Sequence, residues 1–265
     1  MTNLDIYCFT HIPLPGLENL GYKVAGIKKK GFPKSYFTSD SGENIIEKEK
    51  YYSEYVFHYW FWKNKLKEYN KDDWIGFCQK RRFWLQKKID ITPKNFTELN
   101  NVILKTVPDE WKNYNSIIQP IMLLKEKKMV MIKRGFKSLI KNPSIFFNKD
   151  KHSIKLHFDM HHGYGNLDKA INVMNLNDRE DFREYVNTNI GFSANNMFIA
   201  KKEIAEKWFN DVFSWLFACE EVLGFENLKG YETRIYAYLA ERYLSFWFNK
   251  YSQSLKWPWV FADLK

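Results

Sequence analysis

The sequence predicts an α/β fold in which helices flank a mixed β-sheet, organised as one domain with a helical C-terminal part. Short apolar runs bounded by turn residues, as at 74–78, are typical of buried strands. Longer segments with apolar residues at three- and four-residue steps, as at 50–66, are typical of helices that cover a sheet. The two kinds of segment alternate through the first half of the chain, and helical patterns dominate the second half.

Proline and glycine set the limits of the predicted elements. Pro13, Pro15 and Gly16 end a first strand, Pro33 closes a second, and Pro120 follows another apolar run. Gly224 ends a helix whose apolar face includes Trp208. We predict strands at 5–11, 22–27, 74–78, 114–120 and at the end of 191–200, and helices at 50–66, 96–111, 166–173, 178–188, 201–223 and 232–250. No repeat or composition shift marks a second domain within 1–265.

Composition narrows the class of partner. A net charge of +10 over 265 residues favours an acidic one: nucleic acid, an anionic lipid surface or a phosphorylated substrate. The lysines are scattered, and no zinc finger, basic zipper or RNA-recognition motif is present. Nucleic acid is therefore disfavoured as the partner. Cys8, Cys78 and Cys219 lie far apart, as expected of reduced thiols.

The sequence also predicts where the protein is found. The N-terminus has no secretory signal pattern, and the longest apolar stretch, 55–62, is too short to span a bilayer. We therefore expect a cytoplasmic protein that makes peripheral contact with the anionic inner face of the cytoplasmic membrane through its charge.

The segment 79–82 is the strongest candidate for a functional site. Its polar residues, Gln79, Lys80, Arg81 and Arg82, follow directly after the apolar run 74–78. In open α/β folds, ligands bind at the carboxyl ends of the strands. Two adjacent guanidinium groups at that position suit a diphosphate, because the planar fork of arginine matches phosphate oxygens. The alternative is that both arginines are ordinary surface charges.

Other polar segments are candidates for the same edge. The loop 38–45 offers side chains that bind a sugar or ribose, or else is a solvated connection. Lys63 and Asn64 close the predicted helix 50–66 and are expected to face Arg81 and Arg82. The basic stretch at about 125–151 reads either as an amphipathic helix on an anionic membrane or as a solvated insertion, and we favour the insertion.

A histidine-rich cluster and a glutamate pair complete the candidates. His157, Asp159, His161 and His162 lie within six positions and suit either a metal ion or a substrate phosphate. The adjacent histidines lack the i, i+4 spacing of a helical zinc pair, which favours substrate contacts. Glu220 and Glu221 lie late in a helix, against its dipole, which hints at a functional placement.

Several of these segments together resemble a bacterial family from capsular and lipopolysaccharide gene clusters, long catalogued as a domain of unknown function and grouped with glycosyltransferases. The matching segments run through most of the chain: Thr10 and His11, 40–45, 59–64, 74–83, 196–199, Tyr231, Arg234 and 240–244. The family usually has His-Tyr-Arg-Arg where this chain has Gln79-Lys80-Arg81-Arg82, a departure that keeps both arginines.

The resemblance implies a GT-A-like, Rossmann-like fold and transfer of a sugar from a UDP-sugar donor to a growing capsular or lipopolysaccharide glycan, free or lipid-linked. Some members of the family look like galactofuranosyltransferases, so the expected sugar is galactofuranose or a related hexose. Many GT-A enzymes carry an Asp-x-Asp motif for Mn²⁺ or Mg²⁺ after the equivalent strand, and this chain has none. No cofactor is therefore predicted, and a divalent metal stays open.

The chemistry of sugar transfer then assigns roles to residues. Fixed cations stabilise a departing diphosphate, and Arg81 and Arg82 are the candidates, helped by Lys63. An inverting transfer needs a carboxylate base, for which the candidates are Asp159, Glu220 and Glu221. The donor pocket is expected to be lined by Thr10, His11, Asp40, Asn44, Lys63, Asn64, Gln79, His161, His162 and Asn196. The alternative function is a non-catalytic basic module that binds acidic glycan or a membrane surface within a capsule assembly.

Overall fold

A computed structural model describes residues 3–124, 153–226 and 228–264 of the chain. The basic stretch predicted at about 125–151 lies outside the described residues. The chain divides into two compact units, and each is described by itself. The first unit comprises Met1–Pro120, Asn195–Asn210 and Trp247–Lys265, and the second comprises Ile121–Ala194 and Asp211–Phe246.

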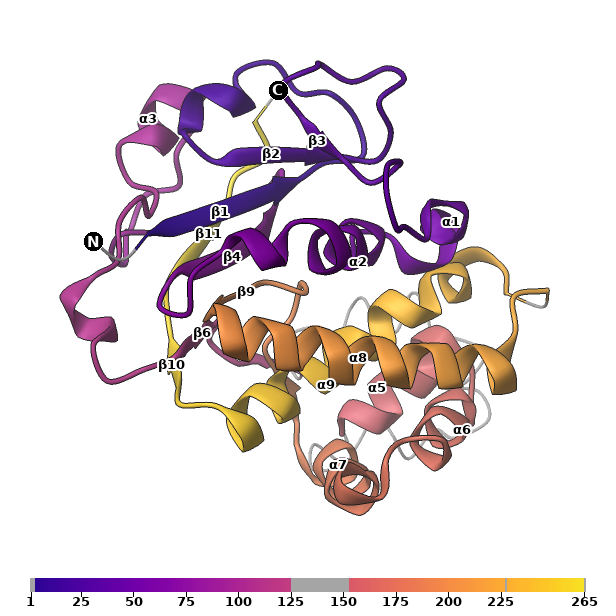
Figure 1. The fold of residues 1–265 in the computed structure, drawn as a ribbon. Helices are drawn as coiled ribbons and strands as arrows, with labels where there is room; N and C mark the ends of the chain where they lie inside the picture. Colours follow the sequence, from indigo (N-terminus) through magenta and orange to yellow (C-terminus); the bar gives the residue numbers. More distant parts are fainter. Residues whose placement is uncertain (1–2, 125–152, 227, 265) are drawn as a thin grey trace. The chain divides into compact units, whose positions relative to one another are not determined.

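A mixed β-sheet forms the centre of the first unit, as predicted (Figure 1). Within the described residues its strand order is β10-β6-β9-β4-β1-β2-β3, and β5 pairs with both β4 and β11. The strands are β1 (Leu4–Phe9), β2 (Lys23–Gly26), β3 (Phe37–Thr38), β4 (Trp74–Gln79), β5 (Arg82–Trp84), β6 (Ser116–Ile118), β9 (Phe198–Lys201), β10 (Ser254–Lys256) and β11 (Trp259–Phe261). The strands expected near 5–11, 22–27, 74–78, 114–120 and the end of 191–200 are all present.

The directions of these strands bring the C-terminal ends of several strands to one edge of the sheet. Strands β1, β2, β3 and β4 are mutually parallel neighbours, and Phe9 of β1 lies opposite Gln79 of β4. Strand β9 runs antiparallel to β4 and begins where β4 ends, with Phe198 opposite Phe77. We call the edge at Phe9, Thr38 and Gln79 the carboxyl edge, and the opposite edge the amino edge.

Side chains alternate between the two faces of the sheet, as strand geometry requires. On one face, Tyr7 and Phe77 pack against Phe57 and Phe61 of helix α2 (Tyr55–Asn64). On the other face, a buried cluster includes Ile6, Cys8, Trp74, Cys78, Trp84, Trp111, Ile117 and Ile199. Both faces of the central strands are therefore covered, which explains why the run 74–78 is continuously apolar.

The predicted helix 50–66 is broken in two. Helix α1 (Glu49–Tyr52) ends before Ser53, whose backbone has φ 51° and ψ −126°, and α2 starts two residues after Ser53. A single helix was therefore wrong over this range. The first unit also holds α3 (Phe96–Asn100), the early part of α8 (Lys202–Leu223), the end of α9 (Ile235–Tyr251) and the 3-10 turns at Leu17–Leu20, Ile46–Lys48, Leu66–Glu68 and Asp109–Trp111.

The helix expected over 96–111 is also wrong beyond its first turns. Helix α3 ends at Asn100, and the chain then pairs beside β5. The Leu104 amide donates to the Trp84 carbonyl, and the Gln86 amide donates to the Val102 carbonyl. These sheet-like bonds replace the helical ones, so tertiary pairing overrides a weak helical pattern.

The second unit is mainly helical. Its helices are α5 (Ile154–His162), α6 (Asn166–Asn172), α7 (Leu176–Thr188), the later part of α8 and most of α9, with a 3-10 turn at Gly230–Arg234 and a small sheet of β7 (Met122–Leu123) and β8 (Gly191–Phe192). The helices predicted at 166–173, 178–188, 201–223 and 232–250 are confirmed within a few residues. Phe182 of α7 packs against Trp215 and Tyr243, which joins three of these helices around one aromatic core.

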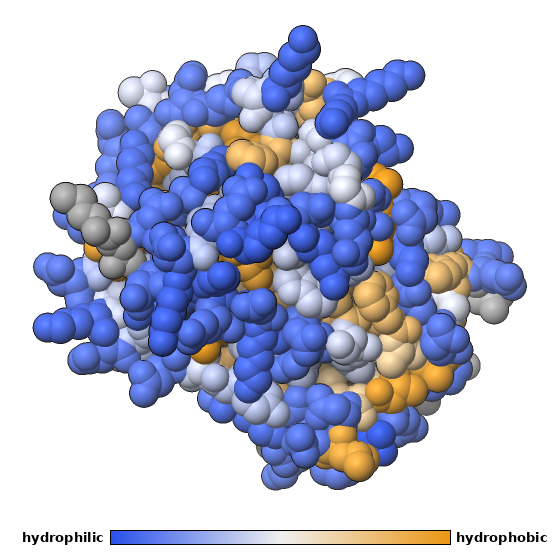
Figure 2. All heavy atoms as spheres, viewed as in Figure 1, coloured by the Kyte–Doolittle hydropathy of each residue, from blue (hydrophilic) through white to orange (hydrophobic). Residues whose placement is uncertain are grey.

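Hydrophilic side chains cover most of the face shown in Figure 2, and apolar side chains occupy limited areas. The most exposed large apolar side chains include Ile12, Ile91, Ile121, Tyr164 and Leu176. Among the described residues, none of the helices combines the length and apolar character needed to cross a bilayer.

His58 makes the stability of the first unit depend on pH. Its imidazole is buried against Phe77, with ring centroids 4.5 Å apart, and burial lowers the pKa of His58 to about 3. The unfolded chain binds a proton near pH 6.5, whereas the folded chain does not until about pH 3. Stability from this residue is therefore lost as the pH falls from about 6.5 towards 3.

We expect the His58→Leu variant to lose less thermal stability than the wild type between pH 7 and pH 4, because it removes this proton uptake on unfolding. Melting temperatures measured across that range for both proteins test the expectation. Parallel curves would show that His58 does not contribute to acid sensitivity.

Candidate active site

Polar side chains from segments far apart in the sequence meet at the carboxyl edge of the first unit. Gln79 ends β4, Asn195 and Asn196 precede β9, and Gln119 follows β6. Glu54 lies at the start of α2, which begins at this edge. The parallel and antiparallel pairing of the strands brings these residues together, since β4 and β6 end where β9 begins.

Gln79 is the centre of a hydrogen-bond network at this edge. Its Nε2 donates to Glu54 Oε1 and to the Asn195 carbonyl, both at 3.0 Å. Its Oε1 accepts a bond of 2.8 Å from Nη1 of Arg82. The amide therefore links a carboxylate, a main-chain carbonyl and a guanidinium, and its orientation is fixed by all three.

Asn196 and Asn195 extend the network. Asn196 Nδ2 donates to Glu54 Oε1 at 2.8 Å, and Asn196 Oδ1 accepts from the Tyr55 hydroxyl at 3.3 Å. Asn195 Nδ2 donates to Gln119 Oε1 at 3.1 Å. Glu54 and Asn196 are 9% and 5% exposed, so these bonds form where water competes little and are correspondingly strong.

The backbone is strained at the same place. Among the described residues, the non-glycine positions with positive φ are Ser53 at 51°, Asn195 at 74° and Asn196 at 51°. Ser53 directly precedes Glu54, and its hydroxyl lies 3.3 Å from His11 Nε2. Backbone conformations of this kind cost free energy and cluster at functional sites, where they hold side chains in a required position.

The two predicted arginines have different surroundings. Lys80 and Arg81 form the turn between β4 and β5, because Gln79 pairs directly with Arg82. Arg82 bonds to Gln79, as described above. Arg81 is 44% exposed and lies 3.6 Å from Asp263. Both guanidinium groups lie within 6 Å of the Phe261 ring centroid, at 5.9 and 5.7 Å.

The remaining candidates of the first unit hold the polar loop 40–45 and the end of β1. Thr10 is fully buried, and its amide donates to the Ala25 carbonyl at 2.8 Å. His11 Nδ1 lies 3.2 Å from Glu49 Oε1. Lys63 lies 3.7 Å from Glu43, and Asn64 Nδ2 donates to the Glu43 carbonyl at 2.8 Å.

Asn44 and Asp40 also make bonds within this part of the chain. Asn44 Nδ2 donates to the Gly42 carbonyl at 2.8 Å. Asp40 Oδ2 accepts from the Lys29 amide at 2.8 Å. Burial alone would raise the pKa of the Asp40 carboxyl, but hydrogen bonds from Lys29 and Thr38 outweigh burial and lower it. Both residues thus fix the loop 40–45 and the turn before it.

The other candidates lie in the second unit. Lys155 pairs with Asp159 at 2.6 Å and with Asp168 at 2.9 Å. Asp159 is only 5% exposed, and burial raises its pKa despite the lysine. Glu220 is half-buried and Glu221 is exposed, both near the end of α8.

The histidines of α5 are engaged with protein groups. His161 Nδ1 lies 2.8 Å from the His157 carbonyl, and the two rings stack with centroids 4.3 Å apart. His162 stacks on Tyr238 at 4.0 Å. Arg242 Nη2 lies 3.2 Å from His157 Nδ1, and a cation so close disfavours a metal ion. No three metal-binding side chains converge in the described part of the chain.

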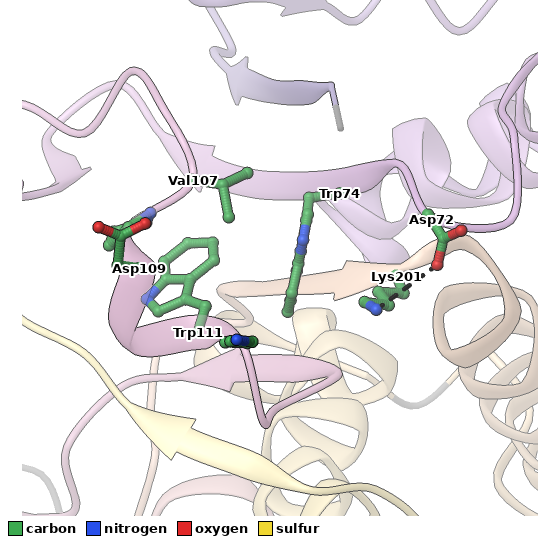
Figure 3. Close-up of a pocket in the computed structure, with 8 residues that line it drawn as sticks. Asp72, Trp74, Val107, Asp109, Trp111 and Lys201 are labelled. Carbon is green, nitrogen blue, oxygen red and sulfur yellow. Dashed lines mark ion pairs between the residues drawn. The ribbon is translucent and has the colours of Figure 1, made fainter. Parts of the chain in front are cut away.

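Two pockets of the first unit open at the amino edge instead. One, of about 530 Å³, is lined by Trp74, Trp111, Asp72 and Lys201 among others (Figure 3). The other, of about 370 Å³, surrounds Asp5, Lys23 and Tyr69. The chemistry of their linings decides whether either pocket is a candidate site.

The amino-edge pockets are poorly suited to a sugar nucleotide. Trp74 and Trp111 are 2% and 1% exposed, so neither ring offers a face for a base or sugar to stack on. Two of the lysines that line them are already paired: Lys201 with Asp72 at 3.6 Å, and Lys23 with Asp5 at 2.5 Å. We therefore place the candidate site at the carboxyl edge, where strand ends present strained and networked polar groups.

Sequence reasoning found only part of this network. Gln79, Arg82 and Asn196 were candidates and are brought together. Glu54, Asn195 and Gln119 were missed. The signal for Glu54 was available, since it is the one acidic residue between Tyr51 and Trp62 of a strongly aromatic segment. A charge in such a segment indicates a buried polar partner.

A known protein structure is similar to this fold. The solved apo structure of WbbM, a bifunctional glycosyltransferase, is similar over 99% of this chain, with a TM-score of 0.66 and 16% sequence identity. The matched region is 46% of the WbbM chain, so the present chain spans about half of that protein. The chain has the α/β fold of this part of WbbM.

Sequence comparison gives the family. Residues 5–253 match DUF4422, described as a domain of unknown function, and the chain belongs to that family. The match covers all of the segments that carried the resemblance in the sequence. No curated protein sequence matches the chain.

The backbone at Asn195 yields a stability prediction. We expect Asn195→Gly to be more stable than Asn195→Ala by about 1 kcal/mol, because both remove the side chain and only glycine adopts positive φ without strain. Urea unfolding of the two variants measures the difference.

A matched pair at Asn210 is the control. This residue is exposed in the middle of α8, where glycine should be less stable than alanine by about 1 kcal/mol. The order of the two variants should therefore reverse between the sites. The same order at both would mean that the left-handed backbone at Asn195 carries no measurable cost.

Proposed function

We propose that the protein is a glycosyltransferase that moves a hexose from a UDP-sugar to a glycan acceptor, within a GT-A-like fold. The observation that carries this proposal is the strained network of Arg82, Gln79, Glu54 and Asn196 at the carboxyl edge. The likeness to part of a bifunctional glycosyltransferase supports it at the level of fold. A capsular or lipopolysaccharide glycan is the acceptor that we propose, and galactofuranose or a related hexose is the sugar.

The proposed reaction breaks the bond between the anomeric carbon and the diphosphate oxygen, and the electron pair leaves with the diphosphate. Arg82 stabilises that charge, because its guanidinium is held in place by Gln79 before the reaction begins. Arg81, on the turn beside it, adds positive potential. The acceptor hydroxyl oxygen forms the new bond and gives its proton to a carboxylate, for which Asp159, Glu220 and Glu221 stay candidates.

The first experiment tests nucleotide binding. UDP and GDP, each with Mn²⁺ or with EDTA, are titrated against the full chain while the melting temperature is followed. We expect UDP at 100 times its dissociation constant to stabilise the fold by about 2.7 kcal/mol, seen as a rise of several degrees. A rise that persists in EDTA supports diphosphate binding by arginine, and a rise only with Mn²⁺ supports a metal-dependent transferase.

No shift with either nucleotide would contradict the proposed function. Strongly salt-dependent binding to acidic glycan or anionic vesicles would then favour the alternative, a non-catalytic basic module. Its proposed carrier, the stretch 125–151, lies outside the described residues.

The two arginines give a matched pair of variants. We expect Arg82→Ala to lower the rate of sugar transfer about 100-fold or more, because it removes a fixed cation from the leaving group. Arg81→Ala removes the same charge from an exposed position and should have a smaller effect. Donor turnover is measured by release of UDP from UDP-galactose and UDP-glucose. Equal effects of the two variants would mean that overall charge matters and the anchoring by Gln79 does not.

A further inference from the structure

Glu54 is a carboxylate with only one of its oxygens in use. Oε1 accepts from Gln79 Nε2 at 3.0 Å and from Asn196 Nδ2 at 2.8 Å. Within the described residues Oε2 has no hydrogen-bond partner, and it is not among the side-chain atoms sealed from solvent without one. The residue as a whole is 9% exposed, so this remaining accessibility is narrow.

This arrangement differs from that of a structural carboxylate. The other buried or half-buried carboxylates of the first unit bind cations or close turns: Asp5 pairs with Lys23, and Asp73 accepts from the Asn3 and Asn70 amides. Glu54 pairs with no cation among the described residues. Two neutral amides from β4 and from the segment before β9 hold it instead, so its charge is not neutralised by the network.

The position of Glu54 indicates what the second oxygen binds. It lies at the amino terminus of α2, where the helix dipole favours a negative charge. It is linked through Gln79 to Arg82, the proposed diphosphate contact. A carboxylate beside a diphosphate site is suited to accept hydrogen bonds from sugar hydroxyls, which are donors as well as acceptors.

We propose that Glu54 Oε2 accepts a hydrogen bond from a sugar hydroxyl of the bound donor. This inference rests on the proposed function and assigns within it a residue that recognises the substrate. The same chemistry has two sources, the ribose of the nucleotide and the transferred hexose. Oε1, Gln79 and Asn196 keep the carboxylate oriented before the donor arrives, so little conformational freedom is lost on binding.

The Glu54→Gln variant distinguishes recognition of the ligand by Glu54 from structural support of Gln79 and Asn196. Glutamine has the same shape, and its carbonyl oxygen still accepts both amide bonds. Its NH₂ group then replaces Oε2, which turns the acceptor into a donor. The internal network is therefore kept, and only the group offered to the ligand changes. The melting temperature without ligand should stay close to that of the wild type.

Affinities of the full chain for UDP, UDP-galactose and UDP-glucose, measured by calorimetry, test the proposal. We expect Glu54→Gln to weaken binding about tenfold or more, the usual effect of losing a hydrogen bond to a charged group. Equal weakening for all three ligands assigns the hydroxyl to the ribose. Weakening confined to the UDP-hexoses assigns it to the hexose.

Two other outcomes would overturn the inference, and they are distinguishable. Wild-type affinity of Glu54→Gln for all three ligands would mean that Glu54 only supports Gln79 and Asn196, and the proposed function would stand. Glu54→Ala, with a lowered melting temperature, would then confirm the supporting role. A wild-type chain that binds none of the three ligands would remove the proposed function together with this inference.

Discussion

The parallel pairing of β1 with β4 is the constraint on which the rest of the first unit depends. Its register sets Phe9 opposite Gln79, so both strands end at the same edge and direct Tyr7 and Phe77 towards α2. A slip of one residue would turn Gln79 away from Glu54 and bury the wrong side chains. One pairing therefore sets both the aromatic core and the polar network.

Much of this fold was predictable because its signals are local. The run 74–78 is continuously apolar since both faces of β4 are covered, and prolines near the ends of several strands mark their limits. The break at Ser53 was not predictable, because aromatic residues continue at helical spacing across it. The segment 101–111 was mispredicted because Val102 and Leu104 bond to Gln86 and Trp84, partners that the local sequence does not reveal.

The candidate site divides in the same way. Arg82 and Gln79 were recognisable, since a sudden change of polarity at a strand end is a local signal. Glu54 carried only the signal of a charge within an aromatic segment, and Gln119 carried none, because their roles arise from pairing with residues 25 to 142 positions away. The different surroundings of Arg81 and Arg82 follow from a two-residue turn, which the predicted strand did not include. The sequence thus indicated that the site lies at the carboxyl edge of the sheet, but it did not identify Glu54 as the carboxylate there.

The order of the strands along the chain also affects how the protein is made. Strand β10 pairs with β6 in parallel, with Ser254 opposite Ser116, and β9 must insert between β6 and β4. The residues of the second unit are synthesised between these partners. On the ribosome, β1 and β4 emerge long before β9 and β10, so an incomplete sheet with open edges must persist during translation. Unpaired strand edges of this kind are prone to aggregation until the later strands cover them.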